Sequence, residues 1–413
     1  MNLLRKNIFS LLIFQGGNYI IPLMTLPYLT RVLDINGFGL YSTVFSLSQY
    51  FIIFIDYGFN LSATKSIAKA KDNTSINKIF WKVIHTKMVL FLVSGFVLTF
   101  LCFLNMFSFE VLILLIMFLG SVFTPLWFFQ GIENLSSFTK VILLAKFLTL
   151  PLYFLLVHDS GDVWLAIGVM SSVNFLSAIF SLIIIKRNYP YIRYEHVSVS
   201  DIIYQLKKAA PIFWATLTIS LYTSSTTLIM SSVSTIEQVS LFSAGDRIRG
   251  AILGVFLVLG NAIYPRVNKL FSQSEKEAFK LVRIVLSIQT VLCGFMLLFF
   301  LLFSGKLANV FYGESFSQVG SILIIFVPAY FFILQSTVLG NYILLPLGYN
   351  KAYAVLPTLC AIIHIPLCAA LSHYFGAIGG AASITIVEAI SFLFLVLYMY
   401  KKSLLKKCLV NSE

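Results

Sequence analysis

The residues best suited to chemistry in this chain of 413 residues are a few ionisable side chains that interrupt long apolar stretches. Asp246, Arg247 and Arg249 lie together in the run Ser243-Ala-Gly-Asp-Arg-Ile-Arg-Gly250, ahead of a mostly apolar segment. At membrane depth a charge is costly unless it faces a cavity or a partner, so each is a functional candidate. A planar guanidinium suits a phosphate or an acidic sugar. The alternative is an interfacial anchor in which Asp246 neutralises one arginine, because the two arginines project about 200° apart on a helix.

Two further cations stand alone in apolar surroundings. Arg31 follows Leu26-Pro-Tyr-Leu-Thr30, where the proline frees backbone groups and a bend is expected. A role in substrate binding or gating and snorkelling of the side chain to the interface both fit this position. Lys146 lies away from any expected chain turn, so it either faces a cavity or is satisfied between helices. With Arg247 and Arg249, these two residues are the candidate substrate-binding cations.

The candidate ion-coupling carboxylates are Asp56, Asp246 and Glu388. Asp56 lies in Ile53-Phe-Ile-Asp-Tyr-Gly-Phe-Asn60, where it could exchange a proton or pair with a cation such as Lys65 or Lys87. A buried carboxylate in a low dielectric holds its proton longer, so a coupling role stays open beside structural pairing.

Motifs for covalent or cofactor chemistry are absent from the sequence. There is no G-x-x-x-x-G-K-[ST] phosphate loop, no G-x-S-x-G elbow and no H-E-x-x-H pair. The five cysteines show no C-x-x-C or histidine-paired spacing, so neither a disulfide framework nor a metal site is indicated. We therefore predict a protein that is not an enzyme and that needs no cofactor.

Composition indicates the environment of the elements that carry these residues. The chain is 59% hydrophobic and 11% charged, with 40 phenylalanines, whereas a soluble domain is about 45–50% apolar and 25% charged. No water-exposed surface could be built from such a sequence, so the chain resides in a bilayer and leaves no room for a sizeable soluble domain. The net charge of +13 does not indicate a nucleic-acid partner, because such binding needs a basic face on a folded, water-exposed element and none is expected here.

Apolar stretches of about 20 residues, the length of a membrane span, recur along the whole sequence and predict twelve transmembrane helices. The predicted spans are residues 8–30, 38–64, 84–105, 110–130, 140–157, 163–185, 209–233, 239–264, 282–303, 318–345, 351–372 and 377–400.

The distribution of positive charge predicts the orientation of these spans. With the N-terminus in the cytoplasm, nearly all of the 29 basic residues fall on the cytoplasmic side, and the opposite side keeps only Arg31 and Lys306. Both termini are therefore expected in the cytoplasm. The cytoplasmic connections near 65–83, 186–208 and 265–282 are long and basic, and contact with anionic headgroups is their simplest role.

A weak internal repeat suggests two related halves. At a shift of 201 residues Asn60 meets Asn261 and Lys65 meets Arg266, although chance could also produce these matches. A shift across six spans gives two parallel six-helix lobes around a central cavity. The expected divisions are an N-lobe at 1–185, a cytoplasmic linker at 186–208, a C-lobe at 209–400 and a basic cytoplasmic tail at 401–413.

The motifs of the first 70 residues resemble a known family. They are Leu26-Pro-Tyr-Leu-Thr-Arg-Val-Leu33, Gly37-Phe-Gly-Leu-Tyr41, Asp56-Tyr-Gly-Phe-Asn60 and Ala63-Thr-Lys65. With them the chain is similar to the polysaccharide flippases of the multidrug/oligosaccharidyl-lipid/polysaccharide exporter superfamily, and more narrowly to the Wzx-type O-antigen flippases of Gram-negative bacteria.

This resemblance implies a V-shaped, all-α fold of twelve helices in the bacterial inner membrane. It also implies alternating access that moves an undecaprenyl-pyrophosphate-linked oligosaccharide from the cytoplasmic to the periplasmic leaflet, driven by a proton or sodium gradient. The implied partners are this lipid-linked oligosaccharide and membrane lipids, with the glycan polymerase and the chain-length regulator as further candidates. A drug or cation antiporter of the same superfamily is the alternative, and a membrane glycan polymerase or ligase is a weaker one.

Overall fold

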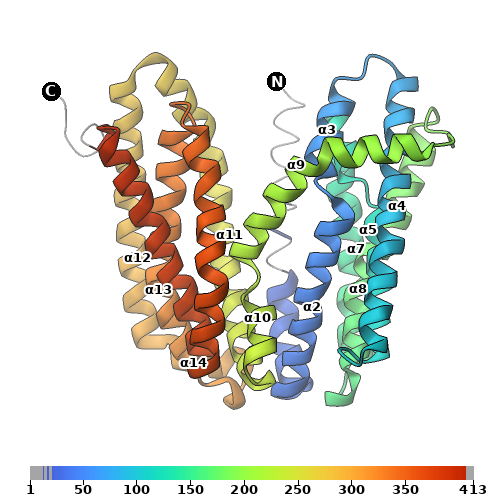
Figure 1. Ribbon diagram of the computed structural model, residues 1–413. Helices are drawn as coiled ribbons and strands as arrows, with labels where there is room; N and C mark the ends of the chain where they lie inside the picture. The colour runs from blue at the N-terminus through green and yellow to red at the C-terminus, as the bar shows by residue number, and fades with distance from the viewer. Residues whose placement is uncertain (1–12, 14–15, 18–20, 406–413) are drawn as a thin grey trace. The chain divides into compact units, whose positions relative to one another are not determined.

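The structure is a computed structural model that describes residues 13, 16, 17 and 21–405, without the side chains of 258, 261, 262 and 350–354. Within this described part the protein is built from helices and contains no strand, which confirms the all-α prediction (Figure 1). The first predicted span begins at residue 8, and the predicted basic tail runs to residue 413, so both lie partly outside the described residues.

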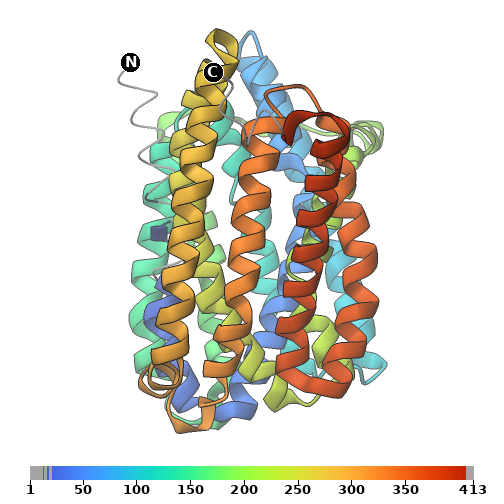
Figure 2. The same ribbon diagram turned by 90° about the vertical axis from the view of Figure 1, so that its left-hand side faces the viewer.

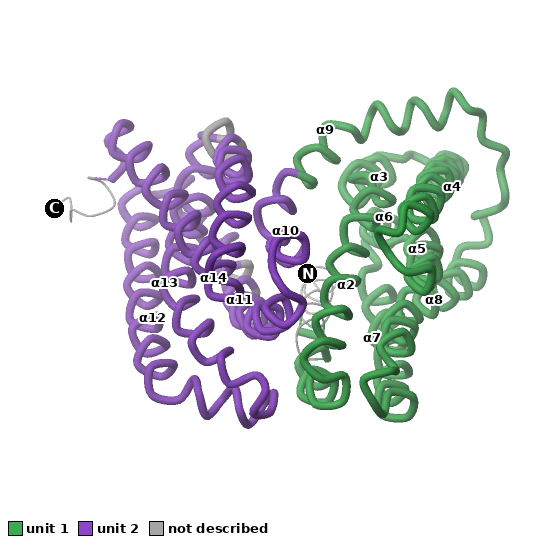
Figure 3. Tube along the Cα trace, turned by 60° about the horizontal axis from the view of Figure 1, so that its bottom comes forward, with its two compact units in different colours: residues 1–217 green, residues 218–413 purple. Residues whose placement is uncertain are grey.

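The chain divides into two compact units, residues 1–217 and 218–413, which Figure 3 colours separately. The first unit contains a helix at 21–32 and the elements that follow it. These are α2 (Asp34–Asp56), α3 (Phe59–Ala68), α4 (Asn73–Phe103), η1 (Phe109–Ile113), α5 (Leu114–Val122), α6 (Leu126–Gly131), α7 (Leu135–Leu156), η2 (Ser160–Asp162), α8 (Val163–Asn188) and most of α9 (Val199–Thr223).

The second unit contains fewer and longer helices. They are α10 (Thr226–Val233), α11 (Ile236–Gln273), α12 (Glu275–Tyr312), η3 (Glu314–Phe316), α13 (Val319–Leu339), the π-helical turn η4 (Gly340–Leu344) and α14 (Asn350–Lys401). Figure 2 shows α12, α13 and α14 side by side, with α13 in contact with both neighbours.

Eight helices of the described residues are long and apolar enough to cross a membrane. They are Asp34–Ala68, Asn73–Phe103, Phe109–Gly131, Leu135–Leu156, Ser160–Asn188, Glu275–Tyr312, Glu314–Leu344 and Val355–Lys401. Nine of the twelve predicted spans match these eight helices, because 351–372 and 377–400 both belong to the last one. The predicted span 239–264 lies inside the longer α11.

The continuous α14 changes direction where two spans were predicted. Gly376 has φ 55° and ψ −132°, which is not helical and lies in the positive-φ region that favours glycine. A Cβ at this position would lie 2.3 Å from Oε1 of Gln238, and the same oxygen accepts a hydrogen bond from the backbone N–H of Ala377 at 2.8 Å. The glycine and its close neighbour therefore end one span and begin the next.

Three other expected segments differ in detail from the observed helices. The predicted span 38–64 is interrupted at Tyr57 and Gly58, which both adopt the left-handed conformation. The predicted span 209–233 is divided between α9 and α10 at Ser224 and Ser225. Residues 199–208, which were expected in the linker, are already helical because α9 begins at Val199.

The outer faces of the helices agree with a lipid environment. On α12, Ile288, Val291, Phe295 and Leu302 are 53–66% exposed and recur at helical spacing along one face. Water would penalise such a stripe, whereas hydrocarbon tails favour it.

Candidate functional site

Five of the seven candidate residues lie in two polar clusters, one in each compact unit. The first cluster depends on the break between α2 and α3. Tyr57 ends α2 in the left-handed conformation, and its ring stacks on Phe213 of α9 at 4.3 Å. A Cβ at Gly58 would lie 2.7 Å from Cγ2 of Ile212, so the absence of a side chain lets α9 approach. This turn holds Asp56, the last residue of α2, inside the unit.

Asp56 forms an ion pair with Lys87 of α4. The Lys87 Nζ lies 2.7 Å from Oδ1 of Asp56 and donates a hydrogen bond to the Ser121 carbonyl oxygen at 2.5 Å. The Lys87 side chain is 1% exposed and that of Asp56 is 27% exposed. Of the two pairings open in the sequence, the pairing with Lys87 is therefore the one that forms, and it satisfies an otherwise costly buried ammonium.

A cavity of about 260 Å³ adjoins this ion pair. Its polar lining is Asp56, Asn60, Ser121, Thr124, Lys146 and Asn174. Asn60 donates a hydrogen bond from Nδ2 to Oδ2 of Asp56 at 3.3 Å. The structure thus brings two of the candidate residues, Asp56 and the half-buried Lys146, to the wall of one cavity. The amine, amide and carboxylate groups that line this cavity can form hydrogen bonds with a polar ligand.

The second cluster centres on Arg249 in α11. The Asp246 Oδ1 accepts hydrogen bonds from Nε of Arg249 at 2.7 Å and lies 2.6 Å from its Nη2. The guanidinium carbon also lies 5.4 Å from the ring centroid of Phe326 in α13, a cation–π distance. The Arg249 side chain is 12% exposed. Asp246 therefore neutralises Arg249 in particular, as the anchor interpretation required for one of the two arginines.

Glu388 of α14 completes this second cluster. It is 9% exposed, forms a side-chain hydrogen bond with Tyr222 and interacts electrostatically with Arg249. His364 is 1% exposed, and its Nε2 lies 3.1 Å from Oγ1 of Thr226. Its Nδ1 has no hydrogen-bond partner among the described residues. The cluster thus combines one guanidinium, two carboxylates, a phenol and an imidazole, a set that can bind an anion or relay a proton.

Two predicted site residues belong to neither cluster. Arg31 is exposed near the end of the helix at 21–32. Arg247 is half-buried and interacts electrostatically with Tyr312, whose hydroxyl donates to the Ala244 carbonyl oxygen at 3.0 Å. The two arginines of the Asp246 run thus have different neighbours, in keeping with their angular separation on a straight helix.

The residues that sequence reasoning did not select supply most of the cluster contacts. Tyr222 belongs to the hydroxyl-rich stretch Tyr222-Thr-Ser-Ser-Thr-Thr227, and neither Tyr222 nor Asn174 is distinguished by sequence from the many other polar residues of the apolar spans. Contact between α14 and the end of α9 could not be read from sequence spacing. The roles of all seven predicted residues in binding or coupling remain predictions.

The fold and the buried charges define a polytopic membrane protein with the fold of the multidrug/oligosaccharidyl-lipid/polysaccharide exporter superfamily. A solved lipid II flippase, MurJ, in an inward closed conformation aligns with 97% of this chain and 90% of its own, with a TM-score of 0.69 and 15% identity. An inward-facing multidrug resistance MATE family transporter of that superfamily aligns with 97% of this chain and all of its own, with a TM-score of 0.65 and 17% identity.

Comparison of sequences identifies the family. Residues 4–271 match the family described as polysaccharide biosynthesis protein, and the chain belongs to that family. A proposed O-antigen transporter of Escherichia coli (strain K12) is 29% identical over 407 residues, covering 97% of this chain and 98% of its own. A second proposed O-antigen transporter, from Shigella dysenteriae, is 29% identical over 399 residues, which cover 95% of this chain and 99% of its own. The resemblance drawn from the motifs of the first 70 residues is thereby confirmed.

Proposed function

We propose that this protein is a flippase that moves a lipid-linked oligosaccharide of O-antigen type from the cytoplasmic to the periplasmic leaflet of the bacterial inner membrane. The observation that carries the proposal is the end-to-end similarity to two proposed O-antigen transporters. The fold shared with a lipid II flippase supports it. We further propose undecaprenyl pyrophosphate as the carrier and a cytoplasmic location for both termini, which the charge bias of the connections favours.

The physical demand of this cargo matches the chemistry of the two clusters. A charged pyrophosphate and hydroxylated sugars cannot cross about 30 Å of hydrocarbon unaided, whereas a polyprenyl tail can remain in lipid. The protein must therefore offer cations and hydrogen-bonding groups at membrane depth. Arg249 with its aromatic neighbour Phe326, and Lys146 beside the cavity of the first unit, are groups of this kind.

Coupling to an ion gradient would use the carboxylates that contact these cations. In this proposal Glu388 and Asp246 compete for Arg249, so protonation of one carboxylate strengthens the hold of the other on the guanidinium. Asp56 would act through Lys87 in the same way. Arg31 and Arg247 are then proposed as additional cations that the cargo meets outside the clusters.

A genetic experiment tests the proposed direction of transport. The gene is deleted in a host that makes an O-antigen, and lipid-linked oligosaccharide is measured on each leaflet of the inner membrane. Accumulation on the cytoplasmic leaflet, relieved by the wild-type gene, is the expected result. Efflux of a fluorescent cation without any change in lipid-linked oligosaccharide would instead identify a drug or cation antiporter.

A further inference from the structure

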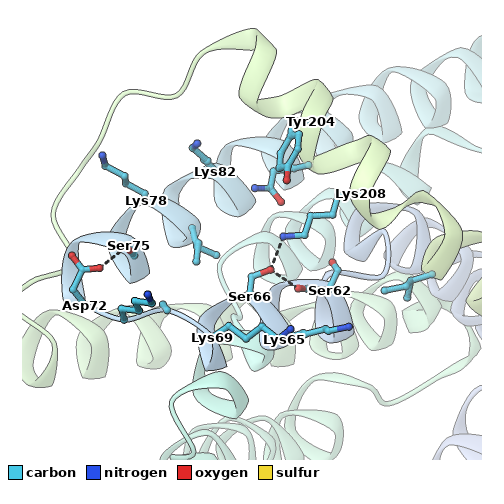
Figure 4. Close-up of a pocket in the computed structure, with 15 residues that line it drawn as sticks. Ser62, Lys65, Ser66, Lys69, Asp72, Ser75, Lys78, Lys82, Tyr204 and Lys208 are labelled. Atoms are coloured by element: carbon cyan, nitrogen blue, oxygen red, sulfur yellow. Dashed lines mark hydrogen bonds between the residues drawn. The ribbon is translucent and has the colours of Figure 1, made fainter.

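A lysine-rich pocket lies within the first unit, and its lining residues are different from those of the first cluster. It has a volume of about 770 Å³ and is formed by α3, the start of α4 and the start of α9 (Figure 4). Its charged lining residues are Lys65, Lys69, Lys71, Asp72, Lys78, Lys82 and Lys208. The charge bias of the sequence predicts that this part of the protein faces the cytoplasm.

The pocket carries more positive charge than its own acids neutralise. Asp72 accepts a hydrogen bond from Ser75, and Asp201 pairs with Lys82 at 2.7 Å. Six lysines thus face two carboxylates, which leaves an excess of four positive charges.

The lysines are spaced so that they repel one another. Lys65 of α3 and Lys69, the residue that follows its end, are four residues apart, and Lys78 and Lys82 are four residues apart on α4. Like charges at this spacing destabilise a helix. A bound anion would offset this repulsion, so two such pairs in the lining of one pocket favour an anion as its ligand.

Polar contacts fix the third wall of the pocket. The Lys208 Nζ of α9 donates to Oγ of Ser66 in α3 at 2.8 Å, and the Lys82–Asp201 ion pair joins α4 to α9. Figure 4 shows Lys208 directed to Ser66, with Lys65 and Lys69 along the neighbouring helix. The helix α9 is therefore held against α3 and α4, and the pocket has a defined form rather than being an open basic surface.

We propose that this pocket binds the phosphate-bearing headgroup of a membrane lipid. Several ammonium groups around a hollow of this size can neutralise a phosphodiester or a pyrophosphate. The hydroxyl of Ser62, which also lines the pocket, can donate a further hydrogen bond to it. The hydroxyls of Ser66 and Ser75 already donate to the Ser62 carbonyl oxygen and to Asp72. An anionic phospholipid and a polyprenyl pyrophosphate share this chemistry, so the inference holds whether or not the proposed transport function is correct.

Titration of the full-length protein in neutral detergent tests the proposal. Binding of phosphatidylglycerol and of undecaprenyl pyrophosphate is followed by microscale thermophoresis, with inorganic pyrophosphate as the competitor. The pocket variant is Lys65→Gln/Lys69→Gln/Lys78→Gln, which spares the contacts of Lys82 and Lys208. The control is Lys269→Gln/Lys276→Gln/Lys280→Gln, which removes the same charge from exposed positions of α11 and α12.

The expected result is saturable binding of one or both lipids, displaced by pyrophosphate. We expect the affinity of the pocket variant for the lipid to fall by about tenfold or more, and the affinity of the control to equal that of the wild type. The lipid that binds identifies the source of the headgroup. Equal losses in both variants, or no saturable binding of either lipid by the wild type, would overturn the proposal. A Lys65→Arg/Lys69→Arg/Lys78→Arg variant keeps the charge and is expected to bind like the wild type. No step of the measurement depends on translocation, so it cannot fail merely because the transport proposal fails.

Discussion

Arg249 lies among two carboxylates and an aromatic ring, so we expect its charge to have a structural use as well as the proposed role in binding. We expect Arg249→Gln to reduce surface glycan by about tenfold or more, because a buried charge pair loses its cation and the cargo loses a binding group. The double variant Asp246→Asn/Arg249→Gln removes both charges of the pair. It should recover much of the protein level but not the surface glycan, since Asp246 no longer carries an unpaired charge and Glu388 keeps its hydrogen bond with Tyr222.

The matched control for this pair is Lys306→Ala, an exposed lysine of α12, which should leave glycan display unchanged. Surface glycan is quantified by immunoblotting at equal membrane levels of each variant. Restoration of glycan by the double variant would mean that Arg249 serves only to neutralise Asp246.

Lys87 is the most buried charged side chain of the first cluster, and its partners make a stability prediction. Lys87→Met leaves Oδ1 of Asp56 and the Ser121 carbonyl oxygen without their donor, which should cost about 2 kcal/mol of unfolding free energy. Asp56→Asn/Lys87→Met should regain part of this loss, because the uncompensated carboxylate is removed. Thermal unfolding of the purified variants in detergent measures both effects. If the single variant were as stable as the wild type, the pair would not hold the two helices together.

At the scale of residues, the sequence predicted which ionisable side chains interact within the protein better than it predicted their partners. The cost of charge in hydrocarbon selected Asp56, Asp246, Arg249 and Glu388, and each of these has an ionic or hydrogen-bonding partner. Asp246 and Arg249 are partners three residues apart on α11. The partners of Glu388 and Asp56, which are Tyr222 and Lys87, come from other helices. Only the packing of the helices determines those contacts.

At the scale of elements, the bend in α14 depends on one glycine. Gly376→Ala should disrupt the bend, because its φ is positive and a Cβ would overlap the Gln238 side chain. The comparison is Gly294→Ala on the exposed face of α12, where a Cβ would meet nothing within 4 Å. That change should be neutral or stabilising by up to about 1 kcal/mol. Folded protein is measured by size-exclusion chromatography after extraction. Normal yield of Gly376→Ala would show that the bend tolerates a side chain.

The start of α9 is held to α4 by Asp201, and this contact should depend on pH. Hydrogen bonds from Lys82 and Ser198 lower the pKa of the Asp201 carboxyl below its ordinary value. Because the folded pKa is the lower one, the contact is present above the ordinary aspartate pKa and is lost as the pH falls through the folded value. At neutral pH, Asp201→Asn should therefore speed amide exchange in residues 199–208, whereas Lys207→Gln should not.

Hydrogen exchange with mass spectrometry measures this difference, as a protection factor for each peptide. Equal protection in the two variants at neutral pH would show that the ring and apolar contacts of α9, such as Phe213 on Tyr57, are sufficient to hold it.

The positions of most helices follow from hydropathy, whereas their interruptions do not. Apolar length alone located nine of the predicted spans in eight observed helices. The break at Tyr57 and Gly58 lies in an apolar run where a continuous helix has the same hydropathy. It forms because α9 packs against the turn, which is a tertiary cause that a window of sequence does not contain.

At the scale of the whole molecule, composition was sufficient to predict an all-α membrane protein, and motifs were sufficient to suggest the superfamily. The predicted lobes at 1–185 and 209–400 remain predictions. Within the structure, the compact units divide between residues 217 and 218. The nature of the sugar, the coupling ion and the partners depends on side-chain contacts with molecules that no hydropathy pattern encodes.

Translocation by the purified protein tests the central claim most directly. The protein is reconstituted into liposomes that carry undecaprenyl-pyrophosphate-linked O-antigen oligosaccharide, and a membrane-impermeant glycosidase is added outside. With wild-type protein, cleavage is expected to proceed beyond the outer-leaflet fraction. With Arg249→Gln, or without protein, it is expected to stop at that fraction. Cleavage confined to the outer leaflet with active wild-type protein, under an imposed proton or sodium gradient in either direction, would contradict the central claim.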